Sequence, residues 1–166
     1  MIEVREATTE NDLDSVRTQV RTFIGWLQQV YPEAQDVFDR DSKTVEAELA
    51  SLPGAYGPPT GRLLVAYYDS AVAGTVAMQD MGHRICEMKQ MFVSTEFRGK
   101  GLGRALATTL ISDARALGYV QMRLSSGVRQ VAAQGLYRSL GFQEILSYHD
   151  VPESLRSVLL FMELRL

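Results

Sequence analysis

The amino-acid sequence predicts an α/β protein in which one mixed β-sheet carries helices on both faces. Three observations support this fold class. Alternating apolar segments and segments with helical apolar spacing follow one another in the order β-α-α-β-β-β-α-β-α-β-β. Three of these strands are consecutive, and a tight two-residue turn separates the first two. Residues 85–125 then form a strand–turn–helix–strand unit, which is typical of a right-handed parallel crossover.

The chain begins with an alternating segment at residues 2–7, which predicts a first strand. Asn11 or Asp12 is placed to cap a first helix, because apolar residues at helical spacing follow. Residues 31–41 break this pattern, so we expect only a short second helix over residues 42–52.

A loop and three strands are expected next. Residues 53–61 are rich in proline and glycine, which predicts a surface loop. Alternating or continuous apolar segments then predict strands over residues 62–68, 71–79 and 85–93, with Asp69–Ser70 as the tight turn between the first two.

Glycines are expected to end both helices in the second half of the chain. One helix follows a glycine-rich turn and ends near Leu117, where Gly118 is placed as a C-cap. A second helix over residues 128–140 ends in the same way at Gly141. The strands expected around these helices are residues 119–125, 142–149 and 157–166.

The composition is typical of a soluble globular protein, with 46% hydrophobic and 22% charged residues. With 166 residues, the chain is expected to form one domain over residues 1–166. A net charge of -3 argues against nucleic acid as a partner. The single cysteine, the lack of a signal-peptide pattern and the lack of a long apolar run predict a cytoplasmic protein without a membrane partner. His83 and His149 are too few and too separated to predict a metal site.

The stretch Arg98–Arg104 combines three glycines and three cations immediately before an apolar helical pattern. Glycine is a poor helix former and like charges at this spacing repel one another, so the composition favours an anion site here. The P-loop string G-x-x-x-x-G-K-[ST] is absent, and glycines spaced two residues apart do not fit G-x-G-x-x-G. Arg98, Gly101 and Gly103 instead fit the pattern R-x-x-G-x-G.

Backbone chemistry explains why an anion would bind at such a turn. The free N–H groups at a helix N-terminus bind anions, and the helix dipole strengthens this binding. Glycines let the backbone approach a diphosphate closely, and cations add charge-assisted contacts. A flexible turn with solvated cations is the alternative interpretation.

Two motifs in the right order resemble those of one family. The string MFVSTEFRGKGLGRAL, residues 91–106, is similar to the acetyl-CoA-binding motif of the GNAT acetyltransferase superfamily. The string QVAAQGLYRSLGF, residues 130–142, resembles the family's second signature, A-x-x-L-Y-x-x-x-G-F. The element order matches the family over the whole chain. The resemblance therefore implies the GNAT acyl-CoA N-acyltransferase fold and an acetyl-CoA-dependent N-acetyltransferase, an acyltransferase enzyme.

The resemblance also implies that acetyl-CoA is the co-substrate and that no metal takes part. Backbone N–H groups around residues 91–93 are implied as donors to the developing oxyanion, on a strand that must separate from its parallel neighbour. Many family members carry asparagine where this chain has Gln130. The implied acetyl-CoA contacts are Met91, Phe92, Val93, Arg98, Gly99, Lys100, Gly101, Leu102, Gly103, Arg104 and Gln130.

Acetyl transfer needs a neutral amine, a donor for the oxyanion and a proton for the departing thiolate. Tyr137 occupies the recurring tyrosine of the second signature and is the expected acid, because a phenol and an alkyl thiol titrate within about two pKa units of each other. Its alternative role is core packing, since Ala133, Leu136 and Leu140 surround it at helical spacing.

Glu87 is the candidate general base, at a position that matches the catalytic glutamate of some family members. Regular alternation puts Glu87 on one face with Lys89, Met91 and Val93, unless a bulge intervenes. A carboxyl group in a partly buried cleft has a raised pKa, which suits a base. A surface Glu87–Lys89 pair is an equally supported interpretation. Cys86 offers a ping-pong route through an acetyl-cysteine, but its apolar strand favours a packed thiol.

The sequence indicates the identity of the acceptor amine less clearly. Acidic residues cluster between the first two helices, where the family usually shapes its acceptor site, and would suit a cationic acceptor such as a polyamine, an amino sugar or a lysine side chain. Solvated helix ends are the alternative. The acidic residues are Glu33, Asp36, Asp39 and Asp41, and the aromatic residues that could line the same cleft are Trp26, Tyr31, Tyr56 and Tyr148, with His149.

Three functions stay open at this point. The first is direct ternary-complex transfer of an acetyl group to a primary amine of a small molecule or protein. The second is a non-catalytic acyl-CoA-binding sensor or interaction module on the same fold, and the third is transfer of a larger acyl group. The closing strands also offer an edge for a homodimer.

Overall fold

The computed structural model describes residues 1–166, and its seven strands form one sheet in the order β1-β2-β3-β4-β5-β7-β6. The elements occur along the chain in the predicted order. The strands are β1 (Ile2–Glu6), β2 (Arg62–Tyr68), β3 (Ala71–Asp80), β4 (Ile85–Val93), β5 (Gln121–Gly127), β6 (Gln143–Ile145) and β7 (Leu159–Arg165). The helices are α1 (Glu10–Val30), α2 (Gln35–Ala50), α3 (Leu102–Ala116) and α4 (Val131–Ser139).

Strand pairing in the sheet is antiparallel everywhere except between β4 and β5. This one parallel pair confirms the crossover predicted over residues 85–125. The predicted hairpin turn is also confirmed, because Asp69 and Ser70 join β2 to β3 with φ angles of 47° and 71°. Two positive φ angles give a two-residue turn the twist that matches its flanking strands.

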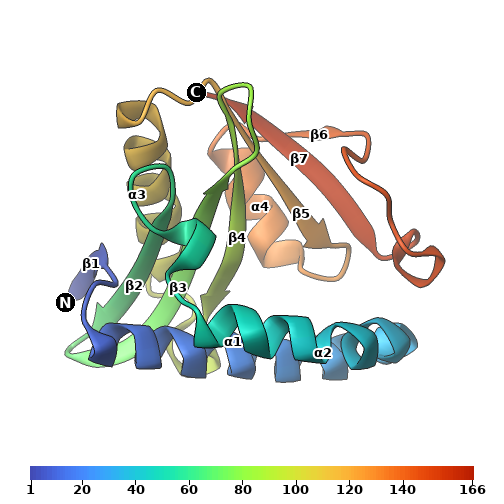
Figure 1. Ribbon diagram of the computed structural model, residues 1–166, viewed down its shortest axis with the longest axis horizontal. Coiled ribbons are helices and arrows are strands. Elements are labelled where there is room, and N and C mark those ends of the chain that lie inside the picture. Colours follow the sequence, from blue (N-terminus) through green and yellow to red (C-terminus); the bar gives the residue numbers. More distant parts are fainter.

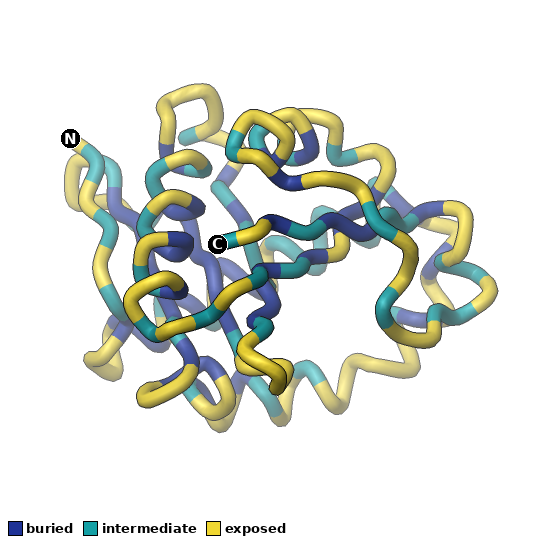
Figure 2. Tube along the Cα trace, turned by 90° about the horizontal axis from the view of Figure 1, so that it is seen from above, coloured by how far each residue is buried: buried dark blue, intermediate teal, exposed yellow.

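Helices cover both faces of the sheet, as the sequence predicts (Figure 1). Strand β2 shows the layering directly: Leu64 and Ala66 belong to the core cluster with α3, whereas Leu63 and Val65 belong to the cluster with α1. Figure 2 shows the buried residues along the inner strands and the exposed ones on the loops and outer helix turns. No helix combines the length and the apolar character needed to cross a membrane.

The first helix begins earlier than the sequence suggests. Thr9 is the N-cap of α1: its hydroxyl accepts a hydrogen bond from the Asp12 N–H at 3.1 Å. Asp12 is the third helical residue of a capping box and not the cap itself, so the expectation of a cap at Asn11 or Asp12 is wrong. The buried Asp12 carboxylate, 2% exposed, also accepts hydrogen bonds from Arg5 at 2.9 Å and from the Tyr67 hydroxyl at 2.8 Å.

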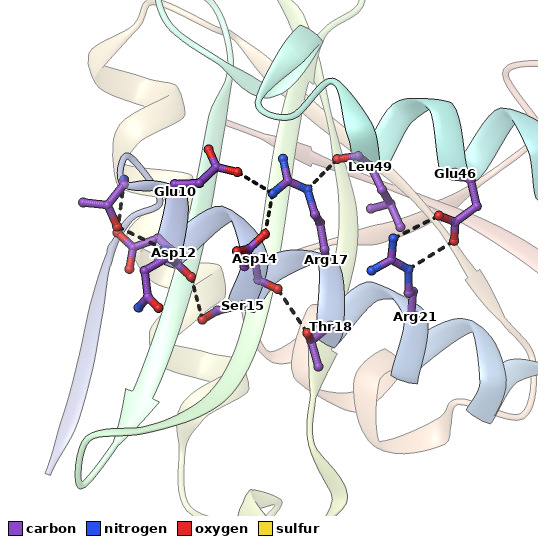
Figure 3. Close-up of polar contacts among 11 residues, drawn as sticks. Glu10, Asp12, Asp14, Ser15, Arg17, Thr18, Arg21, Glu46 and Leu49 are labelled. Atoms are coloured by element: carbon purple, nitrogen blue, oxygen red, sulfur yellow. Dashed lines mark hydrogen bonds and ion pairs between the residues drawn. The ribbon is translucent and has the colours of Figure 1, made fainter.

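The second helix is longer than expected, because α2 starts at Gln35 and follows a short 3₁₀ turn over Pro32–Ala34. Only Val37 and Leu49 of α2 are buried, and this sparse apolar pattern explains why residues 35–41 do not read as helical. One ion pair and one hydrogen bond tie α1 to α2 (Figure 3). Arg17 donates to the Leu49 carbonyl oxygen at 2.8 Å, and Arg21 contacts the Glu46 carboxylate at 2.9 Å.

Elements of the second half are confirmed with shorter bounds. Gly118 and Gly141 follow α3 and α4 with φ angles of +89° and +100°, as expected of glycines that end helices. Helix α4 begins at Val131 and not at residue 128, because the Gln134 side-chain amide donates to the carbonyl oxygens of Gly127 and Val128 and holds them in a turn. Strand β6 keeps only three residues of the expected 142–149, and it forms one edge of the sheet.

A β-bulge interrupts β4 just before the glycine-rich turn. The register with β3 jumps from the Ala77–Lys89 pair to the Thr75–Phe92 pair, and Gln90 within the bulge has a φ of +59°. An inserted residue reverses which face the following side chains occupy. The regular alternation assumed for this strand therefore ends at Lys89.

The strands β4 and β5 separate after a short parallel ladder. Ile85, Cys86 and Glu87 pair with residues 121–123, and the rest of β5 pairs only with β7. In Figure 1 the two strands diverge toward the end of the sheet near α1 and α2. This confirms the expected separation, and it leaves residues 88–93 without a strand partner on the β5 side.

Candidate functional site

A groove of about 460 Å³ runs beside the glycine-rich turn, between the end of β4 and the start of α4; we call it the turn groove. Gly99 and Gly101 in this turn have φ angles of +76° and +88°, a region that favours glycine. A Cβ added at Gly99 would meet no atom within 4 Å. Leu102 and Gly103, which begin the 15-residue helix α3, line the groove as well. The backbone of the turn is thus open to a ligand at a helix N-terminus, as the predicted anion site requires.

The structure brings most of the predicted acetyl-CoA contacts together in the turn groove. Lys100 and Arg104 do not line it: the Lys100 ammonium lies 5.1 Å from the Tyr68 ring centroid, and Arg104 donates to the Ser139 hydroxyl at 2.9 Å. The predicted residues that line the groove are Met91, Phe92, Val93, Arg98, Gly99, Gly101, Leu102, Gly103 and Gln130.

Arg98 is held in place at the groove. Its guanidinium group lies over the Trp26 ring, 4.8 Å from the centroid, and its Nε donates to the Val93 carbonyl oxygen at 3.2 Å. Stacking on an aromatic ring fixes the plane of a guanidinium group while leaving its outer N–H groups free. Trp26 lines the turn groove and not the cleft between the first two helices, where the sequence led us to expect it.

A second cavity, of about 340 Å³, lies where β4 and β5 separate; we call it the inter-strand cavity. Its other walls are α1, α2 and the segment before β7. Phe23, Met91 and Gln130 line both this cavity and the turn groove, so the two spaces adjoin. Gln130 is engaged locally, because its side-chain oxygen accepts from the Gly127 N–H at 2.8 Å.

Glu87 lines the inter-strand cavity and is buried, with 9% of its surface exposed. Its carboxylate accepts hydrogen bonds from the Gln79 amide at 3.0 Å and from the Tyr148 hydroxyl at 2.6 Å. No ion pair joins Glu87 to Lys89, although Lys89 lines the same cavity. The interpretation of Glu87 as half of a surface pair is therefore wrong.

The face assigned to Glu87 in the sequence needs correction. Met88 belongs to the core cluster with α3, so Glu87 lies on the opposite face of the sheet. Beyond the bulge, Met91 and Val93 pack against that same α3 cluster. Glu87 thus shares its face with Phe92, which stacks on α1, and not with Met91 and Val93.

Tyr137 lines the inter-strand cavity while it also packs in the core. It is 5% exposed, its ring lies 5.7 Å from that of Phe142, and its hydroxyl makes no hydrogen bond within the chain. Burial raises the pKa of Tyr137 above that of an ordinary tyrosine, so the hydroxyl keeps its proton at neutral pH. The two interpretations of Tyr137, packing and a free hydroxyl at the site, are compatible.

Tyr148 and Ser126 join the site without having been assigned a role from the sequence. Tyr148 was expected only as a cleft residue, and its bond to Glu87 spans 61 positions in the sequence. Burial, and then the adjacent Glu87 carboxylate, raise the pKa of Tyr148. Ser126 is 6% exposed, lines the cavity and carries a hydroxyl without a partner. No local motif marks either residue, because long-range packing brings Tyr148 to Glu87 and buries Ser126.

Cys86 is not placed for covalent chemistry. It is fully buried in the α3 core cluster and lines neither the turn groove nor the inter-strand cavity. Burial raises the pKa of its thiol to about 12, which leaves almost no thiolate at neutral pH. The packed thiol favoured by the sequence is confirmed.

The acidic residues between α1 and α2 do not form the expected acceptor site. Glu33 pairs with Arg129 at 2.5 Å, and the other three carboxylates accept hydrogen bonds from neighbouring side chains. None of the four lines the inter-strand cavity. Among the aromatic candidates, Tyr31 lines the cavity, whereas Tyr56, Tyr148 and His149 line neither space.

Comparisons with known proteins agree with this geometry. Residues 23–142 match the acetyltransferase (GNAT) family. The chain is 37% identical over 116 residues to an uncharacterized N-acetyltransferase of Schizosaccharomyces pombe, across 69% of this chain and 71% of that protein. It is 33% identical over 127 residues to the N-acetylaspartate synthetase of Danio rerio, across 73% of this chain but only 45% of that protein.

Solved structures share the fold at low sequence identity. The PaiA N-acetyltransferase of Thermoplasma acidophilum, in complex with coenzyme A, superposes with a TM-score of 0.75 and 18% identity, over 100% of this chain and 99% of that chain. An acetyltransferase of Streptococcus agalactiae gives the same TM-score at 17% identity, over 99% and 98% of the two chains. The chain therefore belongs to the GNAT acetyltransferase family, whose members are acetyl-CoA-dependent acyltransferases.

Proposed function

We propose that this chain transfers the acetyl group of acetyl-CoA directly to a primary amine, with both substrates bound at once. One observation supports this more than any other: the cavity that contains Glu87 and Tyr137 adjoins the groove that contains the glycine-rich turn. A donor bound along the turn and an acceptor bound in the cavity would meet where β4 and β5 separate. Direct transfer needs this proximity and no covalent enzyme intermediate.

The turn groove fits the donor. Its glycine backbone is open, α3 begins at the groove, and Arg98 supplies a fixed cation for a diphosphate. Acetyl-CoA supplies the acetyl thioester, and the free side of β4 over residues 91–93 offers backbone N–H groups to its oxygen.

In this proposal Glu87 is the general base. It accepts a proton from the attacking amine as the new C–N bond forms and the C–S bond breaks. Gln79 and Tyr148 each donate to one of the carboxylate oxygens and so fix its orientation. A carboxylate oxygen has two lone pairs, so each oxygen keeps one for the amine proton.

Tyr137 is the general acid. Its hydroxyl donates its proton to the departing sulfur, so one proton leaves the amine and one reaches the thiolate. Tyr137 is protonated at neutral pH, and the absence of an internal hydrogen-bond partner leaves its hydroxyl free to donate to the thiolate. Burial raises the pKa of Tyr137, and a thiolate that forms in the same buried site is disfavoured for the same reason, so the two pKa values shift in the same direction.

Calorimetry and a thiol-release assay test the proposal together. We expect acetyl-CoA to bind at micromolar to millimolar concentration, and we expect free thiol to appear with at least one amine of a broad panel. No binding of acetyl-CoA would refute the proposal. Tight binding without turnover of any amine would replace it by a non-catalytic acyl-CoA sensor, and turnover only with longer acyl-CoA donors would replace acetyl by a larger acyl group.

A further inference from the structure

We propose that the acceptor is a compact monoamine: a primary amine on an aliphatic or aromatic body with no second cationic group. This inference rests on the proposed function, because it names the substrate class for the same site. Three features of the inter-strand cavity carry it: its apolar walls, its charge and its size.

Apolar side chains form most of the inter-strand cavity. Fifteen of its 22 lining residues are hydrophobic, and they come from all four walls of the cavity: α1 and α2, strands β4 and β5, α4, and the segment that leads into β7. Such walls stabilise an apolar ligand body by removing it from water and offer nothing to the hydroxyl groups of a sugar. Nine of these fifteen are Phe23, Ile24 and Leu27 of α1, Val37, Phe38 and Val45 of α2, and Leu155, Val158 and Leu159 near the start of β7.

Charge in the cavity argues against a polyamine. Glu87 is the only acidic residue in the lining, and the proposed function assigns it to the reacting amine. Lys89 is the only lining cation, and it makes no ion pair. A second ammonium group on the acceptor would therefore meet Lys89 without a carboxylate to balance it.

The cavity volume of about 340 Å³ sets the size of the acceptor. Pockets for small molecules commonly span about 300–1,000 Å³, so this one lies at the lower end. It has room for one small amine.

A comparison of three amines tests the substrate class. With acetyl-CoA, kcat/KM should be at least about 100-fold higher for 2-phenylethylamine than for spermidine or glucosamine. Calorimetry with the coenzyme A-loaded protein should show the same order of affinity, and it reads the site without turnover. Equal or tighter binding of spermidine or glucosamine would overturn the inference. Preferential binding of 2-phenylethylamine without transfer would support it while refuting the proposed function.

The variant Leu155→Ser tests the apolar wall. We expect roughly a tenfold loss of kcat/KM for 2-phenylethylamine and little change for acetyl-CoA binding. Leu146→Ser is the matched control in the same segment, since Leu146 is 91% exposed and does not line the cavity. Equal effects of the two substitutions on 2-phenylethylamine would show that the wall does not contact the acceptor.

Discussion

The turn groove and the inter-strand cavity adjoin, yet they are built in opposite ways. The turn groove is made largely from two short stretches, residues 91–103 and 129–136, and its chemistry lies mainly in the backbone of the first. The inter-strand cavity takes its walls from both ends of the chain, and its chemistry lies in side chains. A site whose residues lie close together in the sequence can be predicted from a motif. A site whose residues come together only through long-range packing cannot.

Two residues illustrate the difference. Arg98 belongs to the local motif and lies in the groove as predicted. Asp36 belongs to an acidic cluster that resembles an acceptor site, but it accepts from Ser154 outside the cavity. A charged residue in the sequence indicates a ligand site only where the fold places its side chain in a groove or cavity.

The largest expected effect concerns the base in the inter-strand cavity. Glu87→Gln keeps the shape of the side chain but removes the proton acceptor, so kcat/KM should fall roughly a thousandfold. Acetyl-CoA affinity, measured by calorimetry, should stay within twofold, because the turn groove is untouched. Glu96→Gln on the exposed 3₁₀ turn is the control. Wild-type turnover in Glu87→Gln would remove Glu87 as the base.

Tyr137→Phe should have the next largest effect. It removes one hydroxyl without changing the packing against Phe142, so kcat should fall about a hundredfold while Tm stays near the wild-type value. Because its pKa is raised, ionisation of Tyr137 should not lower wild-type activity up to about pH 10. An unchanged kcat in the variant would leave Tyr137 with a packing role alone.

The sequence predicts the fold well and the site unevenly. Element order and layering follow from local periodicity, and the parallel pair follows from the crossover. The bulge at Gln90 could not be predicted, because nothing in an apolar strand marks an inserted residue. This bulge reverses the face of every side chain that follows it in β4. Contacts such as Tyr148 with Glu87 depend on where a distant segment returns to the sheet.

A third prediction concerns the scaffold that both regions share. Asp12 ties α1 to β1 and β2 through Arg5 and Tyr67, and α1 contributes walls to both spaces. Burial alone would raise the Asp12 pKa, but hydrogen bonds from Arg5, Tyr67 and Thr9 lower it from 3.8 to about 2. A lowered folded-state pKa adds stability that is present above about pH 4 and is lost as the pH falls toward 2.

Denaturant unfolding at several pH values measures this contribution. Asp12→Asn should reduce the free energy of unfolding by about 2 kcal/mol at pH 7, with a smaller difference from the wild type at pH 2. Asp14→Asn is the control, because that side chain is 68% exposed in its pair with Arg17. A deficit that does not shrink toward pH 2 would assign the loss to packing and not to the charge.

The smallest expected effect is on acetyl-CoA affinity, and it distinguishes two cationic residues of the same motif. Arg98 lines the turn groove and stacks on Trp26, whereas Arg104 bonds to Ser139 and does not line it. Arg98→Ala should therefore weaken acetyl-CoA binding roughly tenfold in calorimetry, and Arg104→Ala should change it less than threefold. The Arg98 effect should shrink at high salt, because partly exposed charges are screened. Equal losses for the two variants would mean that a diffuse positive charge, and not the local geometry of the turn, selects the donor.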